Sequence, residues 1–198
     1  MLRGVGPPQA GPRGSADKHP LGIRWHDMRA LFDLFLDICL LRKGPQDVPA
    51  SAALLTAVLG AYGISSLLVL LVSSQAATAI IQALLDVGLL AALTYILLNL
   101  SGYQARFVQT LTTLAGTGTL LGLIALPLVF WMSRTASDEG GSGAASLLFL
   151  VLLGWSIAVM SHVLRHALST SRWLGLLYTF GYLAISMMVA GWVLGIGE

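Results

Sequence analysis

Five long runs of apolar residues fill most of the chain after residue 50, at 50–73, 76–100, 107–131, 146–167 and 173–196. A helix rises about 1.5 Å per residue and the hydrocarbon core is about 30 Å thick, so about 20 apolar residues span a bilayer. Backbone amides find no water in lipid, and an isolated run of this length must therefore bond within itself as a helix. The pattern predicts an all-α polytopic membrane protein, with five transmembrane helices in one domain over residues 50–196.

A shorter amphipathic segment precedes these runs, within residues 23–43. Plotted at about 100° per residue, His26, Arg29, Asp33 and Asp37 share one narrow stripe, with apolar residues opposite. The segment is too short and too charged to span, which predicts an interfacial helix along the cytoplasmic leaflet. A helix docked under the bundle, with Asp33 and Asp37 near basic loop residues, is the alternative. The helix is expected over Trp25–Leu41, because Gly44 ends it and Pro45 cannot continue it.

Residues 1–22 are rich in Gly and Pro and contain few large apolar side chains. Such a composition cannot bury a core, which predicts a disordered cytoplasmic tail. The segment does not resemble a secretory signal peptide, because no apolar stretch follows its basic residues.

Composition and charge agree with a membrane location. The chain is 56% hydrophobic and 10% charged, whereas a soluble domain carries about 25% charged residues. With the N-terminus inside, ten of the eleven Lys and Arg fall in inner segments and only Arg134 falls outside. This bias predicts a cytoplasmic N-terminus and an outer C-terminus. Nucleic-acid binding is not expected, since the chain offers no folded basic surface.

Asp86 stands near the middle of the run 76–100 and is the only acidic residue in the five runs. A charge at this depth costs at least ~2.5–3.5 kcal/mol, so we expect Asp86 to face other helices and to carry a proton. It forms either a polar clasp that holds helices together, a proton or substrate site of a small transporter, or a contact with a second membrane subunit. Five residues at similar depth can donate a hydrogen bond to it: Thr117, Thr119, Trp155, Tyr182 and Ser186.

Enzymatic chemistry has little support in the sequence. One intramembrane acid cannot form an aspartyl protease pair. Asp33 and Asp37 are spaced i,i+4 but lack a third ligand, so a solvated face is favoured over a metal site. Cys39 is the only cysteine, which excludes an internal disulfide. No cofactor, metal or catalytic residue is predicted.

Two histidines near the inner end of the fourth run also share a helix face. His162 and His166 have Arg165 between them and no Glu of a zinc-protease motif. A structural or interfacial role is favoured for the pair, with metal binding or pH sensing as the alternative. Arg165 is most simply a topology anchor.

Small residues in the third and fifth runs indicate close helix packing. Gly118 and Gly122 form a GxxxG pair, as do Gly191 and Gly195, and Gly116 extends the first set. Such residues let helix backbones approach closely, within one chain or between two. Packing within the chain is favoured over dimerisation. Pro127 predicts a kink in the third run.

Two stretches, TLTTLAGTGTLLGLIALPLVF and LGWSIAVMSHVLRHALSTSRW, resemble the third and fourth spans of the Yip family, five-span membrane proteins named for their interaction with Rab-type GTPases. A third, LDICLLRKGPQDVPAS, looks like uncharacterised bacterial membrane proteins. The resemblance implies a five-span fold in a bacterial inner membrane and a role in membrane organisation. It supplies no catalytic residues.

Residues and resemblance together predict a Yip-like, non-enzymatic scaffold or accessory subunit. Its expected partners are the lipid bilayer and either another membrane protein or a second copy. The alternative is a small transporter or proton-coupled carrier that uses Asp86. Many transporters contain an inverted repeat, and five spans do not divide evenly unless the protein dimerises.

Overall fold

The computed structural model describes residues 25–135 and 143–194. Its long helices are α1 (Trp25–Cys39), α2 (Ala52–Leu71), α3 (Ala76–Leu100), α4 (Phe107–Thr135), α5 (Gly143–Ala167) and α6 (Arg172–Leu194), with short 3-10 helices η1 (Pro45–Asp47) and η2 (Gln104–Arg106). Five helices are long and apolar enough to cross a membrane. The predicted all-α class with five spans is confirmed. The predicted tail, residues 1–22, lies outside the described residues.

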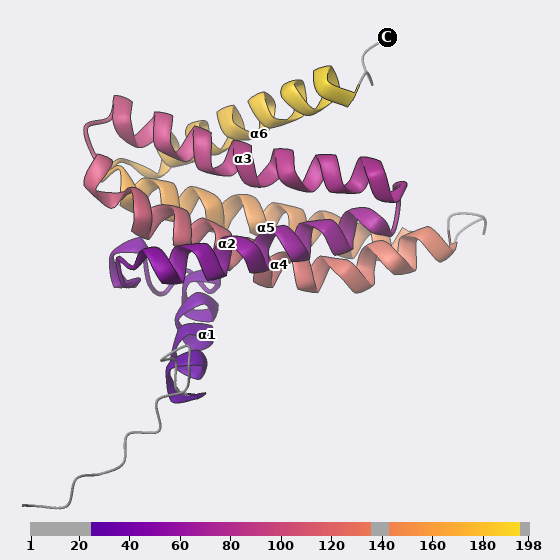
Figure 1. Cartoon of the computed structure of the whole chain (residues 1–198), viewed down its shortest axis with the longest axis horizontal. Coiled ribbons are helices and arrows are strands. Elements are labelled where there is room, and N and C mark those ends of the chain that lie inside the picture. The colour runs from indigo at the N-terminus through magenta and orange to yellow at the C-terminus, as the bar shows by residue number, and fades with distance from the viewer. Residues whose placement is uncertain (1–24, 136–142, 195–198) are drawn as a thin grey trace, which may run out of the picture.

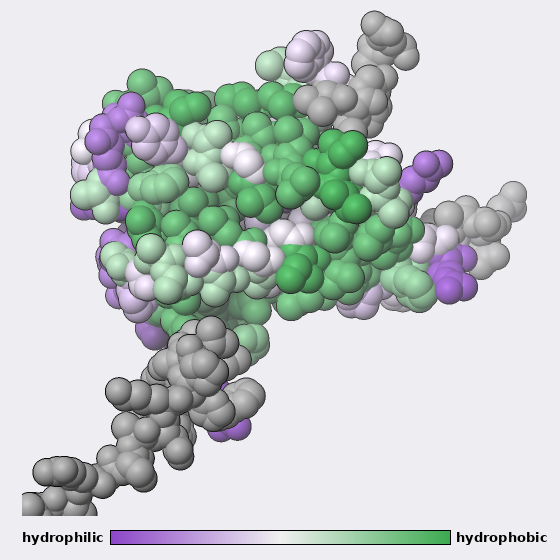
Figure 2. Space-filling model, in the orientation of Figure 1, coloured by the Kyte–Doolittle hydropathy of each residue, from purple (hydrophilic) through white to green (hydrophobic). Residues whose placement is uncertain are grey.

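The five spans run back and forth side by side, and α1 projects from the side of the bundle near one end, at a steep angle to the spans (Figure 1). Helix α4 is central and contacts both α2 and α5, while α3 packs on α2 and α6 on α5. We call the end that carries α1 and the α3–α4 and α5–α6 turns the α1 end, and the other the far end. Figure 2 shows an apolar surface between hydrophilic residues at the two ends. This is an integral membrane protein whose spans contact lipid.

Helix α1 is amphipathic and attached to the bundle. Phe35, Ile38 and Cys39 are buried, whereas Asp33 is exposed. The Asp37 carboxylate pairs with Lys43 at 2.9 Å, beyond the end of the helix. The predicted apolar and polar faces are confirmed at these positions, and the helix is docked on the spans as well as amphipathic. Its place along the cytoplasmic leaflet stays a prediction.

Three helices end at the α1 end with the same backbone motif. A residue with positive φ follows each of α1, α3 and α5: Leu41 (61°), Gly102 (77°) and Ser169 (51°). In each, the next amide bonds back five residues at 2.8–2.9 Å, as in a Schellman motif. Because Leu41 takes the left-handed conformation, α1 ends at Cys39, two residues before the predicted end at Leu41. Pro45 begins η1.

The buried core is concentrated at the α1 end. Every residue of α4 from Thr110 to Thr117 is buried, and none beyond Thr117 is. The largest buried cluster joins α1, η1–α2, α3, α4 and α5 through Phe35, Ile38, Val48, Leu90, Leu111, Leu114, Ala115, Val163 and Leu164. Helix α4 continues through Pro127 to Thr135. The far half of the bundle is therefore the more loosely filled half.

Candidate functional site

Asp86 of α3 is bound by two hydroxyl groups of α2. The Tyr62 hydroxyl donates to Asp86 Oδ2 at 2.7 Å, and the Ser66 hydroxyl donates to the same oxygen at 3.0 Å. Tyr62 and Ser66 are four residues apart, so one face of α2 presents both. These bonds fix the α2–α3 hairpin and hold one carboxyl oxygen in place.

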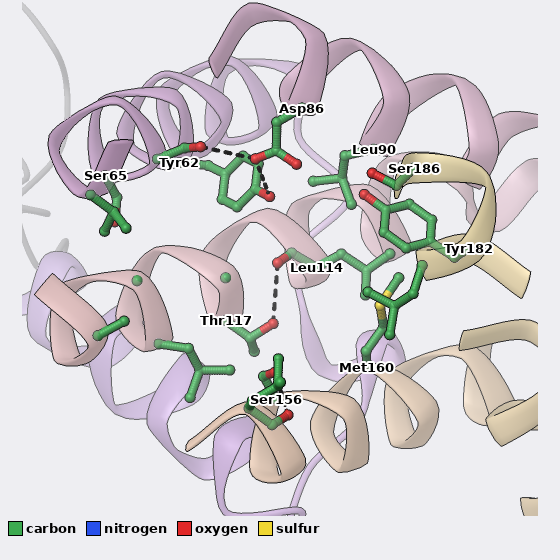
Figure 3. Close-up of a pocket in the computed structure, with 18 of the residues that line it drawn as sticks. Tyr62, Ser65, Asp86, Leu90, Leu114, Thr117, Ser156, Met160, Tyr182 and Ser186 are labelled. Carbon is green, nitrogen blue, oxygen red and sulfur yellow. Dashed lines mark hydrogen bonds between the residues drawn. The ribbon is translucent and has the colours of Figure 1, made fainter. Parts of the chain in front are cut away.

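The other carboxyl oxygen, Oδ1, is turned away from these donors toward Tyr182 and Ser186 of α6 (Figure 3). The space between is a cavity of about 560 Å³ to which all five spans contribute. Its walls are mainly aliphatic. Hydroxyl groups also line it, from Tyr62, Ser65, Ser66, Thr117, Ser156, Thr179, Tyr182 and Ser186. The site is thus an apolar pocket with one carboxyl, the carboxamide of Gln82 and several hydroxyls.

No basic side chain from the described ranges lines this cavity, and Asp86 is the only carboxylic acid among its described lining residues. The one ion pair among the described residues joins Lys43 and Asp37, outside the spans. A carboxylate without a countercharge is costly in an apolar setting. The described lining residues therefore offer Asp86 no countercharge, and a cation from outside the chain would supply one.

The structure gathers some, not all, of the residues predicted around Asp86. Thr117, Tyr182 and Ser186 line the same cavity. The Thr117 hydroxyl donates to the carbonyls of Thr113 and Leu114 at 2.8 and 3.2 Å. Tyr182 and Ser186 face Asp86 across the cavity (Figure 3).

Thr119 and Trp155 do not belong to the site. The Thr119 hydroxyl donates to the carbonyl of Ala115 at 2.7 Å. The Trp155 indole is 43% exposed and donates to the carbonyl of Cys39 at 3.0 Å. Both residues were grouped with Asp86 by their depth along the helices, and depth alone does not fix the direction of a side chain.

The glycines of α4 allow α2 to approach. A Cβ at Gly118 would lie 2.7 Å from Cε2 of Tyr62, and one at Gly122 would lie 2.6 Å from Oγ of Ser65. Gly118 thus makes room for the ring whose hydroxyl reaches Asp86. A Cβ at Gly191 of α6 would meet no atom of the described residues within 4 Å, so this glycine has no such packing role among them. Gly195 lies outside the described residues.

The predicted residues at the α1 end form a separate cluster. His162 Nε2 lies 3.0 Å from the carbonyl oxygen of Lys43, which attaches α5 to the segment after α1. The His162 and His166 ring centres are 4.5 Å apart, and Arg165 Nη2 lies 3.1 Å from His166 Nε2. Within residues 25–135 and 143–194, no three His, Cys, Asp or Glu gather as a metal site would require.

Tyr62 and Ser66 were not predicted as site residues. The spacing of residues along the α2–α3 hairpin nevertheless indicates which part of α2 faces Asp86. Tyr62 lies twelve residues before Ser74 and Asp86 twelve residues after it. In a tight antiparallel hairpin, positions equally distant from the turn face each other.

Comparisons with models of protein families, with curated proteins and with solved structures give no match. The Yip-family resemblance stays a prediction.

Proposed function

We propose that this protein is a small membrane carrier that binds a lipophilic amine, in its cationic form, at Asp86. The observation that carries the proposal is the position of the carboxyl. It opens onto an apolar cavity of about 560 Å³ whose described lining residues supply no positive charge.

The cavity defines the class of ligand. Drug-sized ligands occupy pockets of about 300–1,000 Å³ with apolar walls and few polar groups. The aliphatic walls suit a hydrocarbon body, and Asp86 Oδ1 suits an ammonium group. Tyr182 and Ser186 add hydroxyl oxygens across the cavity that can accept the remaining ammonium hydrogens.

Charge balance favours a cation at this position. The carboxylate of Asp86 and the ammonium group of the ligand neutralise each other in the pocket. Tyr62 and Ser66 stabilise the carboxylate of this pair through Oδ2, because hydroxyl donors bind a charged acceptor more strongly than a neutral one.

Decylamine, with 1-decanol as its uncharged counterpart, tests this proposal by calorimetry on the protein in lipid nanodiscs. Loss of a charged hydrogen bond corresponds to about 1.5–3 kcal/mol, so Asp86→Asn should weaken decylamine binding by about 10–100-fold. Decanol should bind both proteins alike. Asp33→Asn, which removes an exposed carboxylate of α1, should behave as wild type. Equal decylamine binding by wild type and Asp86→Asn contradicts the proposal.

A scaffold or accessory subunit in a bacterial inner membrane, as the Yip resemblance implies, is the second proposal. The observation in its favour is the lateral face of α1, where Phe32, Leu36 and Leu40 are exposed although the helix is firmly attached. On this proposal, a partner protein co-purifies in mild detergent and is lost on Leu36→Glu but kept on Asp86→Asn. The carrier proposal expects the opposite dependence of function on these two variants.

A further inference from the structure

A second, smaller cavity lies at the α1 end, away from Asp86. Its volume is about 270 Å³, and η1, η2, α4, α5 and the α5–α6 turn enclose it. Most of its lining residues are polar: Gln46, Arg106, Gln109, Thr110, His166 and Ser169, with Pro45 and Ala167. A polar cavity at the end of the spans lies where lipid headgroups meet water.

The guanidinium of Arg106 is held rigidly at this cavity. Its Nη1 donates to the carbonyls of His166 and Ala167 at 3.3 and 2.9 Å and to the hydroxyl of Ser169 at 2.8 Å. Its carbon lies 4.8 Å from the centre of the Tyr103 ring. All three bonds use Nη1, and neither Nη2 nor Nε of the guanidinium bonds to another described residue. We call these two nitrogens the free edge of Arg106. A planar guanidinium fixed in this way matches two oxygens of a phosphate.

Thr110 lines the same cavity and carries an unused hydroxyl. Its side chain is 0% exposed, and Oγ1 has no hydrogen-bond partner among the described residues. An unpaired buried hydroxyl destabilises a folded protein. A phosphate oxygen in the cavity would accept this hydrogen bond.

The charges around the cavity favour an anion. Arg165 lies beside it through its contact with His166, and no ion pair to Arg106 or Arg165 occurs within residues 25–135 and 143–194. Asp47 follows the lining residues Pro45 and Gln46 in η1, and its carboxylate accepts the Gly44 amide at 2.9 Å. Two arginines against one engaged carboxylate leave a positive balance.

We infer that this cavity binds a phosphate group, through the free edge of Arg106 and the hydroxyl of Thr110. Phosphate can arrive on an anionic lipid headgroup or as a free phosphate ester. Both sources share the same recognition chemistry. The site is independent of the Asp86 pocket and of the function proposed for it.

Thermal unfolding of the purified protein, with added probe, tests this inference. A ligand that binds the folded state raises the melting temperature. One arm adds phosphatidylglycerol in mixed micelles, with phosphatidylcholine as reference, and the other adds glycerol 3-phosphate or inorganic phosphate. A shift with phosphatidylglycerol alone assigns a lipid headgroup, and a shift with the soluble probes assigns a free phosphate. No shift with any anionic probe overturns the inference.

Variants separate the site from general attraction to positive charge. Arg106→Gln should weaken binding by about 10–100-fold, as expected for a lost charged hydrogen bond. Arg172→Gln removes a cation from the same end, but Arg172 does not line the cavity, and it should change affinity less than about twofold. Equal losses in the two variants contradict the inference.

Thr110→Val keeps the test decisive if Arg106→Gln fails to fold. Valine has the shape of threonine and removes the unpaired hydroxyl, so the ligand-free protein should melt at the same temperature or higher. Its phosphate affinity should nevertheless fall several-fold. Undiminished affinity in a well-folded Thr110→Val protein overturns the role of Thr110 and with it the proposed site.

Discussion

The two halves of the bundle are built differently, although the same helices form both. At the α1 end, α1 and η1 fill the space beside α4 and α5, and Phe35, Ile38 and Val48 are almost fully buried. In the far half, α4 has no buried residue after Thr117, and all five spans border a cavity of about 560 Å³. One end is a packed core, and the other leaves room for a ligand.

The difference shows how a small membrane protein can combine a tightly packed core at one end with a ligand-sized cavity in the other half. Apolar surface gains little from helix association in lipid, so close packing must provide the stability. Three capped helix ends and the α1 contacts provide it at one end. The hairpin bonds from Tyr62 and Ser66 then suffice to hold Asp86 at the edge of the open half.

The largest expected contrast concerns the reactivity of Cys39 at the packed end. Burial raises the pKa of its thiol from 9.0 to about 11. At pH 8 the reactive thiolate, and the rate of modification by iodoacetamide, should be about a hundredfold below that of an unperturbed thiol. Because the pKa is raised in the folded state, the contribution of Cys39 to the free energy of unfolding should be constant below pH 9 and fall between pH 9 and 11. Rapid modification in the folded protein would contradict tight packing.

Phe35 and Phe32 offer a matched pair on α1, three residues apart. Phe35 is 7% exposed and packs in the core, whereas Phe32 is 53% exposed. Phe35→Ala should cost about 3–5 kcal/mol of unfolding free energy, as for a buried ring. Phe32→Ala should cost less than half as much. Thermal unfolding in detergent measures both, and similar losses would mean that α1 is not anchored through Phe35.

Gly116 and Gly88 test the same contrast between α4 and α3. A Cβ at Gly116 would overlap the Phe35 ring, whereas a Cβ at Gly88 would meet no described neighbour within 4 Å. Gly116→Ala should destabilise by about 1–3 kcal/mol through overpacking. Gly88→Ala should stabilise by up to about 1 kcal/mol through helix propensity. If both variants stabilise the protein, the close approach of α1 to α4 is wrong.

Asp86 should contribute least to stability, although it is central to the proposed function. Asp86→Leu removes both interhelical bonds, each worth ~0.6 kcal/mol on average and at most ~1.7 in membrane proteins. Asp86→Asn keeps an oxygen that accepts from Tyr62 and Ser66. Its free energy of unfolding should therefore lie within about 1 kcal/mol of the wild-type value, as thermal unfolding in detergent would measure. Collapse of the fold on Asp86→Asn would make Asp86 a structural clasp and not a ligand site.

The sequence predicts the spans well because an isolated apolar segment in lipid can satisfy its backbone hydrogen bonds only as a helix. The bounds of α3 coincide with the apolar run 76–100. The end of α1 could not be predicted in this way. Leucine rarely adopts the left-handed conformation of Leu41, and here burial of the neighbouring Ile38 and Cys39 outweighs that cost.

The site was only partly predictable. Hydropathy identifies Asp86 as an intramembrane acid and its depth suggests neighbours, but the helix face decides which of them reach it. For this reason the indole of Trp155 donates to the backbone carbonyl of Cys39 and does not bond to Asp86. Tyr62 and Ser66 follow from the hairpin register, which apolar periodicity does not reveal because α2 is apolar on all sides.

The dependence of binding on the charge of the ligand tests the role of Asp86 most directly. Calorimetry in lipid nanodiscs gives the affinities of decylamine and of uncharged 1-decanol for each protein. The ratio of the two affinities should fall by about 10–100-fold from the wild type to Asp86→Asn, with Asp33→Asn as the matched control that keeps the ratio. An equal ratio in the wild type and in Asp86→Asn would contradict binding of the cation at Asp86.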